Sequence, residues 1–251
     1  MPNLNELLQK ADSYKKRITS ARPLAREELN SLDDYFRVGF TYTSNALEGN
    51  TLTISETKIL LEDGLTVAGR PLKDCYEAVG HGSAYDFMLD LARQQDMIIT
   101  EDHIKKLHRL FYQKVDSDQA GQYRTIQVYI SGTEYVPPAP DDVPVLMKHL
   151  ADQIQSSRPT LHPIELAAMA HKRLVDIHPF IDGNGRTARL LMNLILVNTG
   201  YGVVSIPPIW RNDYINALSA SRRLNDMEPF TTLIAECVIE TERDYCRLLR
   251  L

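Results

Sequence analysis

A dense group of polar and small residues lies between His178 and Arg189, in the order His-Pro-Phe-Ile-Asp-Gly-Asn-Gly-Arg-Thr-Ala-Arg. The residue before a proline is disfavoured in the α region, so Pro179 is expected to end the preceding helix and leave the His178 imidazole on a loop. A loop histidine that is neutral near pH 7 can accept a proton from an incoming hydroxyl. His178 is therefore our candidate general base.

The residues after the histidine predict an anion site. Gly183, Asn184 and Gly185 favour a tight turn that leads directly into a helix. Backbone N–H groups at such a helix start bind anions. Arg186 and Arg189 lie on one face of the first helical turn, and forked guanidinium groups suit phosphate oxygens. The pattern indicates a cradle and a cationic clamp for a nucleoside triphosphate.

A carboxylate, Asp182, directly precedes this turn. Magnesium commonly takes one or two carboxylates together with substrate phosphate oxygens, so Asp182 is the candidate Mg²⁺ ligand beside a bound nucleoside triphosphate. Residues 183–188 also match the dinucleotide pattern Gly-x-Gly-x-x-Ala, but a helix rather than a strand is expected before them. His171 lies in no metal-binding motif, and we interpret it as a packing or hydrogen-bonding histidine.

The elements around this loop are predicted to be helices. Residues 163–177 are rich in alanine, and residues 185–198 are apolar on most sides, which places the latter helix at the centre of the core. A Thr53–Glu56 capping box opens a short helix that ends near Gly64. Further helical patterns cover residues 25–43, 72–95, 100–114, 141–156, 211–223 and 229–249. The fold class is expected to be all-α.

The single strand-like region is residues 126–136, where apolar and polar residues alternate before a turn at Gly132 and Thr133. This predicts a β-hairpin on the helical body, with edge backbone groups available to a partner chain. Tyr129 and Tyr135 could equally serve cross-strand packing or target recognition. The first strand contains Gln127, Val128, Tyr129 and Ile130.

A second carboxylate of interest is Glu48. Gly49 and Asn50 are typical stop residues, which places Glu48 near the C-terminus of the helix that starts at about residue 25. The helix dipole disfavours an anion at this end. Glu48 is therefore expected to have a cationic partner.

Composition narrows the function classes. With 251 residues, 43% of them hydrophobic and 24% charged, the chain reads as a soluble globular protein with one sizeable core. The net charge of -5 argues against a general nucleic-acid binder. The absence of a signal-peptide core and of a membrane-spanning apolar run leads us to expect no membrane contact and a cytoplasmic location. Cys75, Cys237 and Cys246 are expected to be reduced packing residues.

The stretch from His178 to Arg189 resembles the signature His-x-Phe-x-Asp/Glu-Gly-Asn-Gly-Arg-x-x-Arg of Fic (filamentation induced by cAMP) proteins at every specified position. The resemblance covers about residues 100–235, including Gly121-Gln122-Tyr123-Arg124 at the entry to the predicted hairpin. It implies a Fic-type helical bundle with one β-hairpin flap. Residues 1–95 would be an N-terminal helical region with an inhibitory helix at about 26–50, and residues 96–251 the catalytic core, with the flap at about 126–136.

The resemblance also implies an activity, the transfer of AMP from ATP to a Ser, Thr or Tyr hydroxyl of a target protein. Phe180 would anchor the loop in the core, and target segments would dock on the flap by strand addition. The implied roles are a general base at His178, a Mg²⁺ ligand at Asp182, an anion cradle at Gly183, Asn184 and Gly185, and phosphate binding by Arg186 and Arg189.

Residues 44–49, Ser-Asn-Ala-Leu-Glu-Gly, resemble the inhibitory pattern Ser/Thr-x-x-x-Glu-Gly/Asn of the same family. The resemblance implies that Ser44 and Glu48 belong to an inhibitory helix, with Glu48 paired to Arg189 in place of the γ phosphate. In one departure, the chain has Tyr214–Ile215 where some relatives carry a Tyr-Tyr pair near the adenine. The base preference is therefore not carried over.

Two other functions stay open at this point. The same site could remove AMP from a modified target, with Glu48 or a water that it orients in the hydrolysis, or the chain could be a non-catalytic module that senses ATP. The sequence does not name the target or the signal that relieves inhibition, and it leaves a homodimer open.

Overall fold

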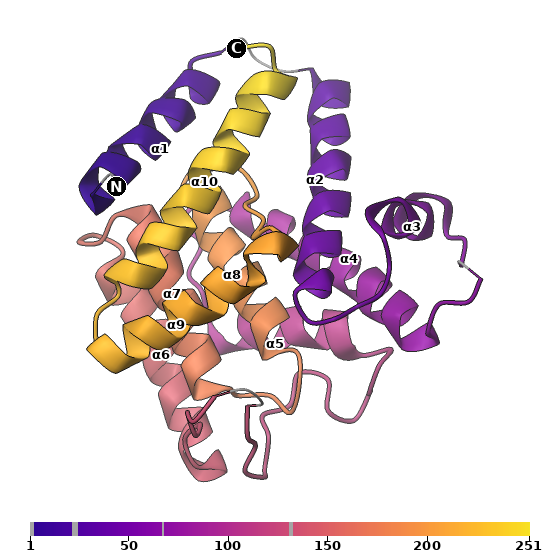
Figure 1. Cartoon of the computed structure of the whole chain (residues 1–251), viewed down its shortest axis with the longest axis vertical. Helices are drawn as coiled ribbons and strands as arrows, with labels where there is room; N and C mark the ends of the chain where they lie inside the picture. The colour runs from indigo at the N-terminus through magenta and orange to yellow at the C-terminus, as the bar shows by residue number, and fades with distance from the viewer. Residues whose placement is uncertain (1–2, 22–24, 67, 131–132) are drawn as a thin grey trace.

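The computed structural model describes residues 3–21, 25–66, 68–130 and 133–251, and all regular elements within these ranges are helical (Figure 1). The all-α prediction is thus confirmed. The α-helices are α1 (Leu4–Thr19), α2 (Arg26–Ala46), α3 (Ile54–Lys58), α4 (Leu72–Ala92), α5 (Glu101–Tyr112), α6 (Val143–Ser157), α7 (Pro163–Ile177), α8 (Asn184–Asn198), α9 (Arg211–Leu224) and α10 (Glu228–Leu248). Short turns of other helix types are η1 (Ile59–Asp63), η2 (Pro140–Asp142) and η3 (Pro208–Trp210).

Helix α8 forms the centre of the bundle, as its apolar sequence predicts. Leu190, Leu191 and Leu194 are completely buried, and each such side chain contributes roughly 1.5–3 kcal/mol of hydrophobic stabilisation. The helix packs against α7 and α4, and α4 in turn packs against α5. The alanines of α7 are also fully buried, which lets its backbone approach α8 closely. The start of α8 is therefore held rigidly at one end of the core.

Helix α1 was not predicted from the sequence, and it lies beside α10 (Figure 1). Its start is a capping box, in which the Glu6 N–H donates to Asn3 Oδ1 at 3.0 Å and the Asn3 N–H donates to Glu6 Oε2 at 3.1 Å. Leu7 and Leu8 are buried in the main core. The Asn-x-x-Glu spacing before two leucines was the available signal.

Two expectations from composition can be compared with the structure. All three cysteines are free and buried, which confirms their interpretation as reduced packing residues. Within the described ranges, none of the helices combines the length and the apolar character that crossing a bilayer requires.

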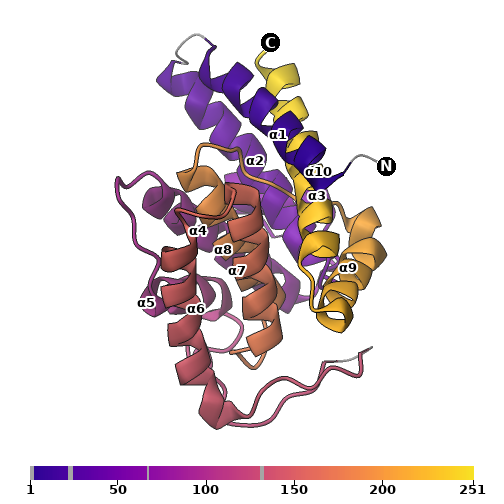
Figure 2. The same ribbon diagram turned by 90° about the vertical axis from the view of Figure 1, so that its left-hand side faces the viewer.

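The predicted β-hairpin is the main correction. Residues 122–130 and 133–139 are extended arms without strand pairing, and the predicted turn at Gly132 falls partly outside the described residues. Figure 2 shows the arms running out together from beside the lower end of α6. We call residues 122–139 the flap, meaning its described part. Gln127 holds the two arms together, since its Nε2 donates to Pro137 O at 2.9 Å and to Val128 O at 3.2 Å.

The missing ladder has a physical reason. Pro137 and Pro138 lack backbone N–H donors, so the second arm cannot supply the hydrogen bonds that a ladder needs there. Side-chain donors instead occupy carbonyls at the base of both arms, because Arg124 donates to Ile126 O and Pro138 O. The alternation of apolar residues correctly predicts extended backbone. The strand pairing that the same alternation also predicts is absent from the described residues.

Candidate active site

His178 terminates α7 in the left-handed region, with φ 52° and ψ 57°, so the imidazole lies on a loop as predicted. Its Nδ1 lies 3.3 Å from Val175 O, and because a carbonyl can only accept, Nδ1 carries the proton. The lone pair is then on Nε2. Burial lowers the pKa of His178 below its ordinary value, and the nearby charge of Arg124 acts in the same direction. The imidazole is thus a neutral acceptor near pH 7.

The loop after His178 is closed by one buried side chain. Asn184 Oδ1 accepts from the Phe180 N–H, and Asn184 Nδ2 donates to Phe180 O, both at 2.9 Å. The side chain of Asn184 therefore shapes the loop, which leaves only its backbone for the predicted anion cradle. Gly183 has φ +76°, and an added Cβ would lie 2.6 Å from Phe111 Cε1. Glycine is required at this turn.

A histidine that the sequence analysis did not single out supports the loop from below. The ring of His108 on α5 stacks on Phe180 with centroids 3.8 Å apart. Its Nδ1 accepts from the Gly121 N–H at 2.8 Å, so its Nε2 donates to Asp182 O at 3.0 Å. Burial lowers the pKa of His108 to about 4, which keeps this donor and acceptor pair fixed at neutral pH. Its position on the buried stripe of α5 was the available signal.

Asp182 faces solvent at the mouth of the loop, with 45% of its side chain exposed. Its Oδ1 accepts from the Gly183 N–H at 2.6 Å and lies 3.6 Å from Arg186 Nη2. An exposed carboxylate oriented in this way can still bind a cation through its remaining oxygen.

Arg189 is the point where α2 meets α8. The guanidinium is 1% exposed, and its Nη2 lies 2.7 Å from Glu48 Oε1. Nε donates to Ser44 Oγ at 3.0 Å, and Nη2 also donates to Ser44 O at 2.8 Å. Glu48 thus has the cationic partner expected from its place at the end of α2. Burial alone would raise the pKa of Glu48, but the ion pair with Arg189 outweighs this and holds the pKa below its ordinary value.

Two glycines make room for this pair. Gly49 has φ +90° and ends the turn after α2. At Gly185, an added Cβ would overlap Glu48 Oε1 and lie 3.1 Å from Arg189 Nη1. Because that Nη1 is buried and has no hydrogen-bond partner among the described residues, a cationic donor is unsatisfied beside the start of α8.

Arg186, the second arginine of the predicted clamp, is held differently. It is 3% exposed, and its Nη1 lies 2.8 Å from Glu77 Oε1 of α4. Glu77 is itself buried and also accepts from Asn50 Nδ2 at 3.1 Å. The guanidinium rests 4.3 Å from the centre of the Phe111 ring. The sequence analysis did not identify Glu77, which has no motif around it.

The motif loop and Glu48 line one cavity of about 450 Å³, and the two arginines lie behind its lining. Its lining includes His178, Asp182, Gly183, Asn184, Gly185 and Glu48, together with Tyr129 and Ile130 of the flap and Tyr214 and Ile215 of α9. The Tyr214 hydroxyl lies 3.2 Å from His171 Nε2, and His171 is fully buried, so its interpretation as a hydrogen-bonding core histidine is confirmed. The Tyr135 hydroxyl donates to Asp176 O at 2.9 Å.

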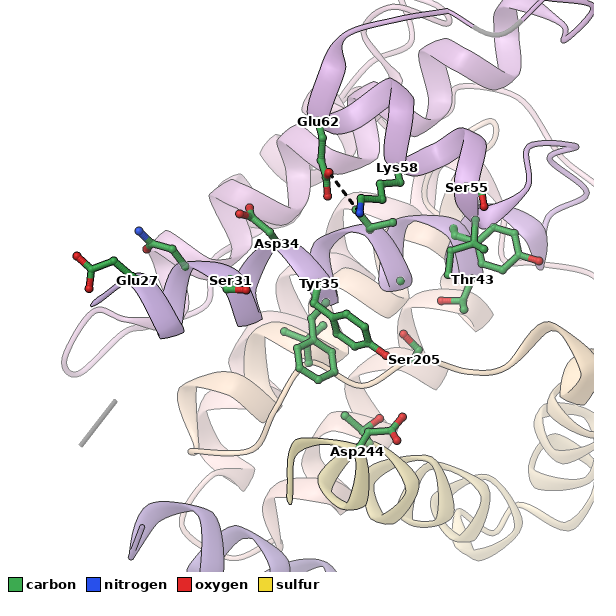
Figure 3. A pocket seen from close by; sticks show the side chains of 18 residues that line it. Glu27, Ser31, Asp34, Tyr35, Thr43, Ser55, Lys58, Glu62, Ser205 and Asp244 are labelled. Carbon is green, nitrogen blue, oxygen red and sulfur yellow. Dashed lines mark ion pairs between the residues drawn. The ribbon is translucent and has the colours of Figure 1, made fainter. Parts of the chain in front are cut away.

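A larger cavity, of about 930 Å³, opens on another face of α2 (Figure 3). Tyr35 of α2 points toward Ser205 and Asp244, whereas Asp34 projects from the other side of the helix, toward the side of Glu62. Lys58 is the one Lys or Arg in its lining, and its Nζ lies 3.8 Å from Glu62 Oε2. An acidic lining of this kind is poorly suited to phosphate groups, so the smaller cavity is the candidate site.

The geometry can be compared with known proteins. The Fic/DOC family model matches residues 98–196. A solved Fic domain containing signaling protein from Bacteroides thetaiotaomicron is 31% identical, with a TM-score of 0.86 and coverage of 99% of this chain and 98% of that one. The chain belongs to the Fic/DOC family. Fic-1 from C. elegans is 30% identical with a TM-score of 0.89, and the match covers 98% of this chain and 73% of the solved one.

Protein adenylyltransferase Fic from Nematostella vectensis is 38% identical over 241 residues, or 94% of this chain. The chain spans 55% of the length of that relative. This likeness extends through α2 and the motif loop, so both halves of the candidate site lie within it.

Proposed function

We propose that this Fic protein is an autoinhibited protein adenylyltransferase that transfers AMP from ATP to a hydroxyl side chain of a target protein. One observation supports this most directly. A neutral histidine with a free Nε2 lone pair, a glycine-rich helix start and the carboxylate of Glu48, which is paired with the buried Arg189, line one cavity. The name and sequence likeness of the adenylyltransferase from Nematostella vectensis agree with this proposal.

In the proposed reaction, His178 Nε2 accepts the proton of a target Ser, Thr or Tyr hydroxyl. The hydroxyl oxygen then forms a bond to the α phosphorus of ATP, and the bond from that phosphorus to the bridging oxygen breaks, releasing pyrophosphate. The contact from Nδ1 to Val175 O keeps the tautomer that this step needs. Burial and the charge of Arg124 keep the pKa of His178 low enough for the base to be unprotonated at pH 7.

The proposed triphosphate site lies at the start of α8. Backbone N–H groups of residues 183–185 would bind phosphate oxygens, and the unpaired Nη1 of Arg189 would donate to the γ phosphate. Asp182 fits a Mg²⁺ ion, since it is an exposed oxygen donor at the mouth of the same loop. Bound there, the ion would neutralise charge on the phosphates. Arg186 would stabilise the charge of the β phosphate, and its ion pair with Glu77 would fix the position of the guanidinium.

Inhibition is proposed to act through Arg189. Glu48 and Ser44 together occupy its Nε and Nη2 atoms, so the γ phosphate meets a carboxylate instead of a free guanidinium. Residues 1–95 would then act as the regulatory region and residues 96–251 as the catalytic core. Arg211 assists from the core side, because its Nε donates to Leu47 O at 2.8 Å and fixes the end of α2.

The flap is the proposed docking site for the target. Tyr129 is 77% exposed and lines the mouth of the cavity with Ile130. The extended arm 125–130 makes no strand pairing within the described residues, so backbone groups other than the Ile126 and Val128 carbonyls, which accept from Arg124 and Gln127, could pair with an extended target segment. Such pairing would place a target hydroxyl at the open side of His178.

The experiment compares wild-type protein with the Glu48→Ala variant, each incubated with α-labelled ATP, Mg²⁺ and a cell lysate. Removing the carboxylate should raise label on protein by about tenfold or more, which corresponds to about 1.4 kcal/mol or more of barrier. Glu240→Ala removes a glutamate from an exposed pair with Arg243 and serves as the matched control. Adding His178→Ala to Glu48→Ala should abolish labelling, whereas His149→Ala, at an exposed position of α6, should not. Equal labelling by wild type and Glu48→Ala would contradict the inhibition.

A second candidate activity is the removal of AMP from a modified target. The observation in its favour is that the Glu48 carboxylate lines the same cavity and is 36% exposed, so it could orient a water molecule. The lysate proteins labelled above supply the substrate. Release of AMP by wild type but not by Glu48→Ala would favour hydrolysis, and no release by either would exclude it for those proteins.

A further inference from the structure

Arg124 is a buried cation at the junction of the flap and the His178 loop. It is 2% exposed, and no ion pair joins it to a carboxylate within the described residues. A charged group with this burial is costly unless its hydrogen bonds are satisfied. All of its described side-chain partners are backbone carbonyls. The residue was noted in the sequence at the entry to the predicted hairpin, but with no role.

The guanidinium links three separate segments. Nε donates to His178 O at 2.8 Å, Nη1 to Ile126 O at 3.0 Å and Nη2 to Pro138 O at 2.6 Å. The Arg124 N–H adds a contact of 2.9 Å to Pro179 O. One rigid planar group therefore holds the backbone of the His178 loop and the base of both flap arms.

The two ends of this connection differ in how firmly they are held. At the loop end, the Asn184 clamp and the stacked His108 ring fix Phe180. At the flap end, Tyr129 is mostly exposed, and the arms are joined beyond Arg124 by the side chain of Gln127. A segment that pairs with the arms would order them, and a planar guanidinium bonded to both arms would pass that order to the carbonyl of His178.

From this geometry we infer that Arg124 is a positioning residue that couples target docking on the flap to the orientation of the His178 imidazole. The inference rests on the proposed function and adds to it a means by which acceptor binding affects the base. Lysine keeps the charge but has a single nitrogen, which cannot reach three carbonyls in fixed directions. Methionine keeps the length of the side chain and removes both the charge and the donors.

The activity test uses the Glu48→Ala background and follows self-modification with labelled ATP. Arg124→Lys should lower kcat by about tenfold to a hundredfold, because charged hydrogen bonds are lost, and should leave the KM for ATP nearly unchanged. Arg158→Lys, which replaces another poorly exposed arginine bonded to Asn198, is the matched control. Arg124→Met should in addition shift the acid limb of the pH profile upward, because the Arg124 charge that lowers the pKa of His178 is gone. A purely packing role would give no such shift.

A second measurement does not depend on activity. NMR of protein with isotopically labelled histidine reports the His178 ring signals, assigned by their loss in His178→Ala. Gln127→Ala, which loosens the flap arms, should shift those signals when Arg124 is present and should leave them unchanged in the Arg124→Lys background. Equal shifts in both backgrounds, or a kcat for Arg124→Lys within about threefold of its parent, would overturn the inference. If Glu48→Ala transfers no AMP, the proposed function fails, while the NMR comparison still decides the coupling.

Discussion

The two arginines on the first turns of α8 make the same kind of ion pair in different surroundings. Arg186 meets Glu77, and both side chains are at most 6% exposed. Arg189 meets Glu48, whose side chain is 36% exposed. The first pair is enclosed between α4, α5 and α8, whereas the second lies at the rim of the cavity, on the segment just after α2. We call the Arg186–Glu77 pair the inner pair of charges and the Arg189–Glu48 pair the rim pair of charges.

The difference shows which pair can open. Separating buried charges leaves both without water and without a partner, which is strongly unfavourable. At the rim, water can replace Arg189 around Glu48, so this pair can break while the fold remains intact. If one arginine is to stay fixed while the other can be released, the partner of the first must be a buried glutamate and the partner of the second a partly exposed one.

The largest effect is expected for Glu77→Gln at the inner pair of charges. The substitution removes the buried carboxylate nearest to Arg186 and leaves, among the described residues, only the partly exposed Asp182, 3.6 Å away, so the free energy of unfolding should fall by about 3 kcal/mol or more. Urea denaturation followed by circular dichroism measures this. Glu240→Gln in the exposed pair with Arg243 is the control and should cost about 1 kcal/mol or less. A loss of stability as small as that of the control would show that the inner pair of charges does not hold Arg186 in place.

An intermediate effect is expected for Ser44→Ala at the rim pair of charges. The variant removes the hydroxyl that accepts from Arg189 Nε but keeps Glu48 and the Ser44 carbonyl. AMP transfer should rise by about tenfold at most, since one hydrogen bond to a charged group is lost, and should stay below that of Glu48→Ala. Ser221→Ala, at a buried serine on α9 that accepts from the Phe230 N–H, should weaken the fold without raising transfer. Higher transfer in Ser44→Ala than in Glu48→Ala would contradict the order of these contacts.

The smallest effect is expected from pH. Glu48 has its pKa held below the ordinary value of 4.5, so the folded chain favours the ionised carboxylate, and its contribution is fully present above that value. It is lost only as the pH falls through the lowered pKa. The ratio of AMP transfer by Glu48→Ala to that by wild type should therefore stay constant between about pH 8 and pH 5. A ratio that falls toward 1 within this range would indicate that the rim pair is weaker than its geometry implies.

The sequence predicted local features well because their causes are local. The apolar surface of α8 placed that helix at the centre, and Pro179 placed His178 on a loop. The dipole at the end of α2 called for a cation near Glu48, and the family pattern named Arg189, which the structure places 2.7 Å away. Each of these inferences needed only a few neighbouring residues or a known motif.

The features that were missed depend on contacts between distant segments. Glu77 is recognisable only as a carboxylate on a mostly buried helix, and nothing in its neighbours points to Arg186. Arg124 and Gln127 replaced the expected strand ladder with side-chain hydrogen bonds to carbonyls. The alternation of residues 126–130 predicts extended backbone but carries no information about which donors will pair with it.

The bonds between Asn184 and Phe180 have a consequence for how a nucleotide would enter. Because the loop is already closed by its own side chain, binding requires no ordering of this segment, and little conformational entropy is lost there. The affinity for ATP should then be set mainly by the phosphate contacts at Arg189, where Glu48 is bonded to Nη2 and Nη1 is unpaired among the described residues. Under the proposed function, the loop is a preformed receptor, and the regulated quantity is the availability of the Arg189 guanidinium.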